Sequence, residues 1–228
     1  MRIGGIQRTS TLDFPGVLSC VVFTRGCDLD CFYCHNRSLL GQGDCISQEE
    51  VLRFLRRRQG LLDGVVVSGG EPALQPDLKE FLIQVRSLGY RTKLDTNGQH
   101  PQVLGILIGE KLLDYVAVDI KALPRDYKKV CGAGSFQKIL ECLQLLETHG
   151  VPYEVRTTLY PGFTMEMLRQ LLSMLPQMPC WRLNIVRRPQ QLRASDEPWF
   201  EQESLTAGLL IRAQPQLREL QPNLVIPE

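Results

Sequence analysis

The feature that most constrains the fold is a repeated alternation of short apolar runs with longer segments of helical pattern. Leu18–Phe23 (LSCVVF) and Gly64–Ser68 (GVVVS) are apolar at consecutive positions and rich in β-branched residues. Such strands are typically buried on both faces, as in parallel sheets. Similar runs predict further strands at 91–95, 115–119, 153–159 and 182–186. Helices are expected at 47–59, 77–88, 136–149 and 164–175, the first two opening on capping-box sequences.

Strands that alternate with helices pair in parallel through right-handed crossovers. We therefore expect an α/β fold, a partial (β/α)6 TIM-like barrel, because the chain has 228 residues and a full eight-unit barrel takes about 250. An open, doubly wound sheet would produce the same pattern, and periodicity does not separate the two. The length is that of a single domain over residues 1–228, with a less regular tail at about 189–228.

Composition and charge exclude several function classes. The formal net charge is +1, so no overall field attracts nucleic acid or an anionic membrane surface. There is no apolar run of about 18 residues that would span a membrane. The first residues, MRIGGIQRTSTLDFPG, lack the apolar core of a signal peptide, and a cytoplasmic location is expected.

The eight cysteines are unevenly distributed along the chain. A disulfide framework is typical of short secreted chains that lack a large core, which this chain is not. Three cysteines fall within eight residues, and this clustering favours one metal site. The other five are expected to be buried thiols of the core: Cys20, Cys45, Cys131, Cys142 and Cys180.

The clustered cysteines read Cys27-Asp-Leu-Asp-Cys31-Phe-Tyr-Cys34. Cysteine thiolates are the usual ligands of iron–sulfur clusters. A structural zinc site would need a fourth ligand, and His35 adjoins Cys34 too closely to serve easily. A redox-active CxxC pair would leave Cys27 unexplained. We expect a [4Fe-4S] cluster in the loop at about 24–37, with one iron left open to bind a substrate.

Polar motifs follow the carboxyl ends of four expected strands, where parallel α/β folds form their sites. After the cysteine loop come Gly69-Gly70-Glu71-Pro72, Asp95-Thr96-Asn97-Gly98 and Asp119-Ile-Lys121. Taken alone, the first two could be turns and the third a surface ion pair. Together they predict one site at the rim of the sheet.

The CxxxCxxC spacing, with the aromatic Tyr33 before the last cysteine, resembles the radical S-adenosylmethionine (SAM) superfamily. The resemblance implies that SAM chelates the open iron and that the reduced cluster cleaves it into methionine and a 5′-deoxyadenosyl radical. It also implies that the GGE motif holds the amino group of SAM. The SAM contacts implied in this chain are Tyr33, His35, Gly69, Gly70, Glu71, Asp95, Asn97, Asp119, Lys121, Arg156 and Asn184.

The opening segment 5–16 (GIQRTSTLDFPG), together with 23–27 (FTRGC) and 33–36 (YCHN), resembles activating proteins of anaerobic ribonucleoside-triphosphate reductases. Pyruvate formate-lyase activases share part of this pattern. The resemblance of this chain to these activases implies a monovalent cation, Na+ or K+, beside SAM. Its ligands here would be Asp95, Thr96, Asp119 and the carbonyl of Ala117.

The implied reaction removes a hydrogen atom from a backbone glycine of a partner enzyme, expected to be anaerobic ribonucleotide reductase. A flavodoxin or another low-potential reductant would supply the electron. A pyruvate formate-lyase activase would present a histidine after the last strand, and 181–189 (WRLNIVRRP) contains none. The alternatives are that activase type, a radical SAM enzyme of the 7-carboxy-7-deazaguanine synthase type, and a noncatalytic metal-binding scaffold.

Overall fold

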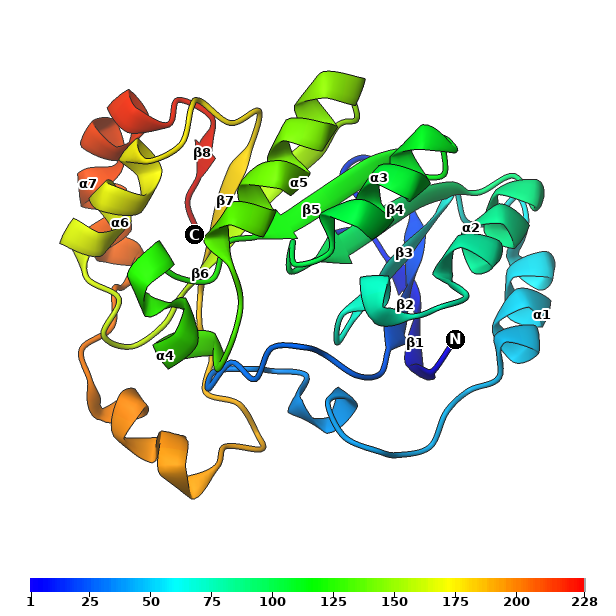
Figure 1. Ribbon diagram of the computed structural model, residues 1–228, viewed down its shortest axis with the longest axis horizontal. Coiled ribbons are helices and arrows are strands. Elements are labelled where there is room, and N and C mark those ends of the chain that lie inside the picture. Colours follow the sequence, from blue (N-terminus) through cyan, green and yellow to red (C-terminus); the bar gives the residue numbers. More distant parts are fainter. Residues whose placement is uncertain (228) are drawn as a thin grey trace. The chain divides into compact units, whose positions relative to one another are not determined.

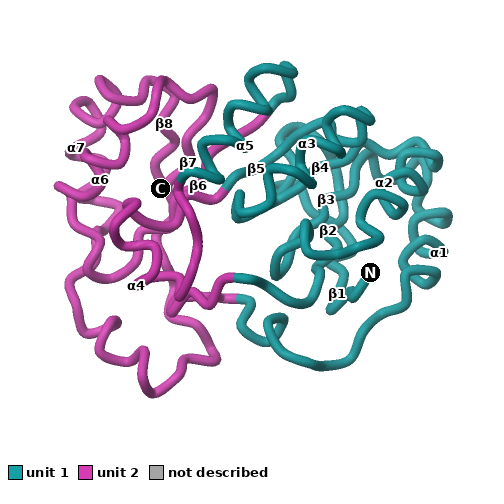
Figure 2. The backbone as a smooth tube through the Cα atoms, in the orientation of Figure 1, with its two compact units in different colours: residues 1–28, 36–118, 137–152 teal, residues 29–35, 119–136, 153–228 magenta. Residues whose placement is uncertain are grey.

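The computed structural model describes residues 1–227 as two compact units, coloured separately in Figure 2. Unit 1 comprises Met1–Asp28, Asn36–Val118 and Gln137–Pro152. Unit 2 comprises Leu29–His35, Asp119–Phe136 and Tyr153–Glu228. The single domain expected over 1–228 stays a prediction.

Unit 1 is built on a five-stranded arrangement (Figure 1). Its strands are β1 (Ile3–Ser10), β2 (Ser19–Thr24), β3 (Gly64–Gly69), β4 (Arg91–Thr96) and β5 (Tyr115–Asp119), the last residue of β5 belonging to unit 2. Strands β2 to β5 pair in parallel in that order, as the sequence predicts. Strand β1 pairs antiparallel with β2 and was not predicted, because its glycine-containing sequence lacks the apolar run of the others and is buried only at its two ends.

The core of unit 1 gathers around β2 and β3. Val21 and Val66 pack with Phe14 and Val17 of the β1–β2 connection. Each fully buried side chain of this kind contributes roughly 1.5–3 kcal/mol relative to an exposed one. The four residues at 64–67 are buried one after another, as expected for a parallel strand covered on both faces.

The helices of unit 1 are α1 (Gln48–Arg58), α2 (Leu78–Ser87), α3 (Pro101–Gly109) and α5 (Phe136–His149), the first residue of α5 belonging to unit 2. Unit 1 also has the short 3-10 turns η1 (Arg37–Leu39) and η2 (Pro72–Leu74). Helix α1 begins as predicted, with the Ser47 hydroxyl accepting a hydrogen bond from the Glu50 amide at 3.1 Å. Helix α2 is also confirmed, but the expected cap is wrong. The Asp77 carboxylate pairs with the N-terminal ammonium of Met1 and caps no amide of the helix. Helix α3 was not predicted, because its apolar sequence carries no helical period.

Unit 2 contains the parallel strands β6 (Tyr153–Leu159), β7 (Trp181–Ile185) and β8 (Leu224–Val225), in that order. Its helices are α4 (Tyr127–Cys131), α6 (Met165–Ser173) and α7 (Ala207–Leu220), with 3-10 turns η3 (Pro124–Asp126) and η4 (Ala194–Glu201). The tail after 189 is more regular than expected, since it contains η4, α7 and β8. Helix α7 has a clear start, where the Thr206 hydroxyl accepts from the Leu209 amide at 3.3 Å.

All six predicted strands and all four predicted helices are present, so the α/β fold with parallel strands is confirmed. Within residues 1–227 no helix combines the length and apolar character needed to cross a membrane.

Candidate active site

The carboxylate of Glu71 joins the ends of β3 and β4. Its side chain is fully buried. One oxygen accepts hydrogen bonds from the Ala73 amide at 3.0 Å and the Thr96 hydroxyl at 2.9 Å. The other accepts from the Asn97 amide at 2.7 Å. Burial raises the pKa of Glu71 to about 7, even though these donors favour the charged form. The side chain predicted to meet SAM is therefore fully engaged within the chain.

The two glycines before Glu71 allow the backbone of the cysteine loop to pass close by. A Cβ on Gly70 would lie 2.0 Å from the carbonyl oxygen of Gly26. Gly69 has a positive φ of 116°, and a Cβ there would lie 2.5 Å from the backbone nitrogen of Thr24. The Gly70 amide donates to the Thr24 carbonyl at 2.9 Å, and the Glu71 amide donates to the Gly26 carbonyl at 2.8 Å. The GGE motif thus holds the chain immediately before Cys27.

The side chain of Asn97 connects the end of β4 to the first cysteine. Its Nδ2 donates to Asp28 Oδ1 at 2.7 Å and lies 3.8 Å from Cys27 Sγ. His100 Nε2 lies 3.1 Å from the other oxygen of Asp28. Unit 1 therefore brings together the first cysteine, the GGE motif and the DTNG motif, as the rim argument predicts. Asp28 and His100 were missed, although their positions beside Cys27 and DTNG could have suggested them.

The two side chains of unit 1 that were predicted to bind a cation contact other protein groups. Asp95 is nearly buried, and its Oδ1 lies 3.0 Å from the ammonium of Lys93. The Thr96 hydroxyl donates to Glu71. Ala117 is fully buried on β5, next to Asp95 in the strand register.

In unit 2, the Asp119 carboxylate lies between two cations. Lys121 Nζ is 3.0 Å from one oxygen and Arg156 Nε is 2.9 Å from the other. Burial would raise the pKa of Asp119, but the charges of Arg156 and Lys121 outweigh it and lower the pKa to about 2. Burial alone would lower the pKa of Lys121, and the adjacent carboxylate raises it. Three of the predicted SAM contacts thus form one charged group.

The second half of the cysteine motif packs against α4. The Asp30 amide donates to the Cys131 carbonyl at 2.9 Å, and the Phe32 amide donates to the Val130 carbonyl at 3.2 Å. The Cys31 thiol is buried, and a hydrogen bond with the Cys131 thiol, followed by burial, raises its pKa. The core thiol Cys131 is therefore a neighbour of the motif, which sequence spacing does not reveal.

Aromatic side chains hold the same segment. Phe32 stacks on Trp199 of η4, with ring centroids 4.3 Å apart and planes at 14°. Tyr33 stacks on Tyr160, with centroids 5.4 Å apart, and its hydroxyl donates to the Lys121 carbonyl at 3.4 Å. The contribution of η4 to this packing was not predicted, because its sequence has no regular pattern.

The side chains of the remaining predicted site residues are more exposed to solvent. His35 is exposed, whereas Cys34 on the cysteine loop and Asn184 on β7 are half-buried. Of the five other cysteines, Cys20, Cys131 and Cys142 are buried as expected. The expectation of burial is wrong for the other two cysteines, since Cys45 is exposed and Cys180 is half-buried.

The profile of the Radical SAM superfamily matches residues 21–175, a span that contains the three clustered cysteines and the GGE, DTNG and DIK motifs. The chain belongs to the radical SAM superfamily. Proteins named as activating enzymes are among those that are similar to this chain. The "Putative glycyl-radical enzyme activating enzyme MJ1227" of Methanocaldococcus jannaschii is 38% identical over 169 residues, which cover 70% of this chain and 68% of that protein. The "Pyruvate formate-lyase-activating enzyme" of Clostridium pasteurianum is 34% identical over 191 residues, 76% of each chain.

Solved structures share the fold. The crystal structure of Streptococcus suis SuiB matches with a TM-score of 0.66 at 15% identity over 91% of this chain. The match covers 48% of SuiB, so this chain spans about half the length of that protein. At this identity the likeness concerns the fold alone.

The donors of this radical SAM chain suit a [4Fe-4S] cluster, because three thiols stand in one loop and thiolates are its usual ligands. Across residues 1–227, however, no three or more His, Cys, Asp or Glu side chains are gathered closely enough to hold a metal ion. The fit is therefore one of donor chemistry and family membership. The side chains predicted to bind Na+ or K+ also contact protein groups, and this cation site stays a prediction.

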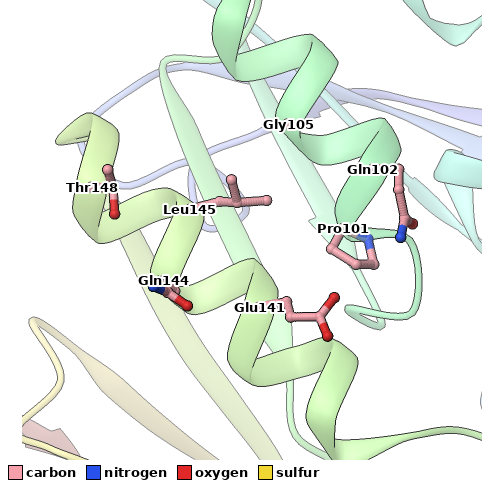
Figure 3. A pocket seen from close by; sticks show the side chains of 7 residues that line it. All are labelled: Pro101, Gln102, Gly105, Glu141, Gln144, Leu145 and Thr148. Atoms are coloured by element: carbon pink, nitrogen blue, oxygen red, sulfur yellow. The ribbon is translucent and has the colours of Figure 1, made fainter.

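A groove of about 420 Å³ lies between α3 and α5 of unit 1 (Figure 3). Gly105 and Leu145 contribute apolar surface, while Gln102, Glu141 and Gln144 supply polar groups. None of the predicted radical SAM site residues lines it.

Proposed function

We propose that this radical SAM protein generates a glycyl radical on a partner enzyme. The observation that supports this most is the 38% identity, over 70% of the chain, to a protein named as a glycyl-radical enzyme activating enzyme. The networks at the strand ends agree with it, since a noncatalytic scaffold needs neither buried charges nor a clustered thiol loop. Placing buried charged groups has a cost unless they are paired, as they are here.

The proposed cofactors are a [4Fe-4S] cluster held by Cys27, Cys31 and Cys34, and SAM. When bound, they supply one-electron cleavage of SAM to methionine and a 5′-deoxyadenosyl radical, which takes a hydrogen atom from glycine. The chain's own residues would bind these cofactors and orient them. The glycines of GGE bring backbone close to the cysteine loop, and Glu71 fixes the ends of β3 and β4. Lys121 and Arg156 supply positive charge suited to the carboxylate of SAM.

The substrate of this reaction would be a protein loop, and the partner we propose is anaerobic ribonucleotide reductase. The opening segment 5–16 and the lack of a histidine in 181–189 support this choice. A pyruvate formate-lyase type of partner is the second candidate, favoured by the 34% identity to the Clostridium activase. In either case we propose a flavodoxin or similar low-potential reductant as the electron donor.

The test is an anaerobic reconstitution with iron and sulfide, followed by addition of reductant, SAM and one candidate partner. We expect a glycyl-radical doublet in the EPR spectrum with the correct partner. The Cys31→Ala variant is expected to give none, whereas Cys45→Ala, at an exposed cysteine outside the motif, should behave as the parent.

The other outcomes separate the alternatives. Accumulation of 5′-deoxyadenosine without a doublet for either partner would favour a radical SAM enzyme acting on a small molecule. The absence of both the doublet and 5′-deoxyadenosine from a fully loaded protein would favour a noncatalytic scaffold.

A further inference from the structure

Unit 1 contains a lysine whose ammonium is enclosed by the protein. Lys93 on β4 is only 1% exposed. Its Nζ lies 3.0 Å from Asp95 Oδ1 and donates to the carbonyl oxygen of Asp13 at 2.5 Å. The ammonium also lies 5.7 Å from the centroid of the Tyr115 ring, within the range of a cation–π interaction. A buried ammonium is tolerated when it has partners of this kind.

The fold explains why these groups meet. Lys93 and Asp95 are two residues apart on one strand, so their side chains point to the same face. Tyr115 is the neighbour of Lys93 in the β4–β5 register. Asp13 belongs to the β1–β2 connection, where the Ser10 hydroxyl donates to its carboxylate at 2.5 Å. The ammonium thereby links the opening segment of the chain to the strand that ends in the DTNG motif.

This arrangement bears on the cation that the family resemblance implies. The expected ligands of a monovalent cation within unit 1 are Asp95, Thr96 and the Ala117 carbonyl. The Thr96 hydroxyl already donates to Glu71. The Asp119 carboxylate is already balanced within unit 2 by Lys121 and Arg156. Lys93 supplies a positive charge to Asp95 at the distance of a charge-assisted hydrogen bond.

We propose that the ammonium of Lys93 is the built-in counterion of Asp95, and that this enzyme therefore needs no dissociable Na+ or K+ to bind SAM. Lys93 is on this account a positioning residue. It keeps the end of β4, and with it Thr96 and Asn97, in place without touching the reacting atoms. The inference rests on the proposed function only in taking SAM as the ligand.

The first test measures SAM binding to the reconstituted wild-type protein by equilibrium dialysis. Buffers of equal ionic strength contain tetramethylammonium, Na+ or K+. We expect the dissociation constant to change by less than about twofold among them, because no cation site has to be filled. A loss of about tenfold in tetramethylammonium would overturn the proposal.

The second test does not depend on SAM. In 205Tl NMR of the wild-type protein, with Tl+ as a probe for K+, we expect no saturable line broadening. Saturable broadening that K+ competes away would overturn the proposal. Failure of SAM to bind in every buffer would count against the proposed function, while the Tl+ result would still decide the counterion question.

Variants sharpen the result. Lys93→Met removes the charge but keeps the length of the side chain, and its thermal unfolding midpoint should fall. If Lys93 occupies the place of a cation, K+ or Na+ should restore part of that loss and tetramethylammonium should not. The matched control is Lys138→Met, at an exposed position of α5, which should unfold as the wild type does in all three buffers. If Lys93→Met does not fold, the two wild-type measurements decide the question.

Discussion

The two halves of the cysteine motif are held by different kinds of interaction. In unit 1, the segment before Cys27 is held by backbone hydrogen bonds from the GGE motif to Thr24 and Gly26, and Asn97 lies beside the cysteine sulfur. In unit 2, the segment carrying Cys31 and Cys34 also makes two backbone hydrogen bonds to α4, but stacked aromatic rings add side-chain contacts that the unit 1 half lacks, and an ion pair adds to them. Phe32 stacks on Trp199, and Asp30 pairs with Arg193.

This difference predicts how each half of the cysteine motif should respond to substitution. The Gly26 carbonyl approaches Gly70 so closely that there is no room for even one methyl group, so the unit 1 side is specific in shape. Stacked rings gain most of their energy from contact area, with roughly 0.5–1.5 kcal/mol from the ring pair itself. The unit 2 side should therefore accept another ring in place of the first.

The largest effect is expected at Gly70. In Gly70→Ala the new Cβ would meet the Gly26 carbonyl at 2.0 Å, and the loop must move. We expect the free energy of unfolding to fall by about 4 kcal/mol, the upper range for one substitution, together with poor cluster loading. Urea unfolding and iron content measure the two effects. Gly5→Ala is the control, since a Cβ there meets nothing within 4 Å; equal losses in both variants would contradict the account.

A pH effect of similar size should arise from Glu71, whose pKa is raised by burial from its ordinary value of 4.5 to about 7. Because the folded state holds the proton more tightly, the stability from this group is fully present below about pH 4.5 and is lost as the pH rises through about 7, a change of about 3 kcal/mol. Urea unfolding at about pH 5 and pH 8 measures it. Glu71→Gln should lose this part of the slope, and Glu80→Gln, exposed on α2, should keep it. The same slope in all three proteins would refute the assignment.

A smaller effect is expected for Trp199→Ala. The variant loses the stack on Phe32 and the half-buried area of the indole, about 2 kcal/mol in all. Iron release to a chelator should also become faster, because the segment around Cys31 loses support. Trp199→Phe should retain most of both properties. If Phe behaves like Ala at this position, stacking is not what holds the unit 2 half.

The smallest effect is expected for His100→Ala. This change removes a partly exposed contact to Asp28, worth less than about 1 kcal/mol. Asn97 still donates to the same carboxylate, so iron retention should be nearly unchanged. Asn97→Ala should release iron faster than His100→Ala, and the opposite order would show that the histidine carries the contact.

The parallel strands and the rim motifs were predictable, because each depends on a local pattern with a known structural consequence. Apolar β-branched runs define β2 and β3, and motifs at strand ends meet wherever strands are parallel. The meeting of Cys27, Glu71 and Asn97 in unit 1 follows from this rule alone.

The missed features depend on contacts between distant segments. Nothing local marks Lys93 as buried, since a lysine in a strand is usually exposed; Asp13 and Tyr115 make its burial possible. Likewise, Trp199 lies in a tail without periodicity, and its role depends on Phe32 far earlier in the chain. The SAM contact predicted for Glu71 stays a prediction, while the hydrogen bonds that its carboxylate accepts from Ala73, Thr96 and Asn97 were not predicted.

The most direct test of the central claim is an isotope transfer. A candidate partner enzyme is prepared with deuterated glycine and incubated anaerobically with the reconstituted protein, reductant and SAM. Mass spectrometry of the 5′-deoxyadenosine then reports where its new hydrogen came from. The account predicts deuterium in this product with the correct glycyl-radical partner. Turnover that forms the glycyl radical but leaves the 5′-deoxyadenosine free of deuterium would contradict direct hydrogen abstraction from glycine.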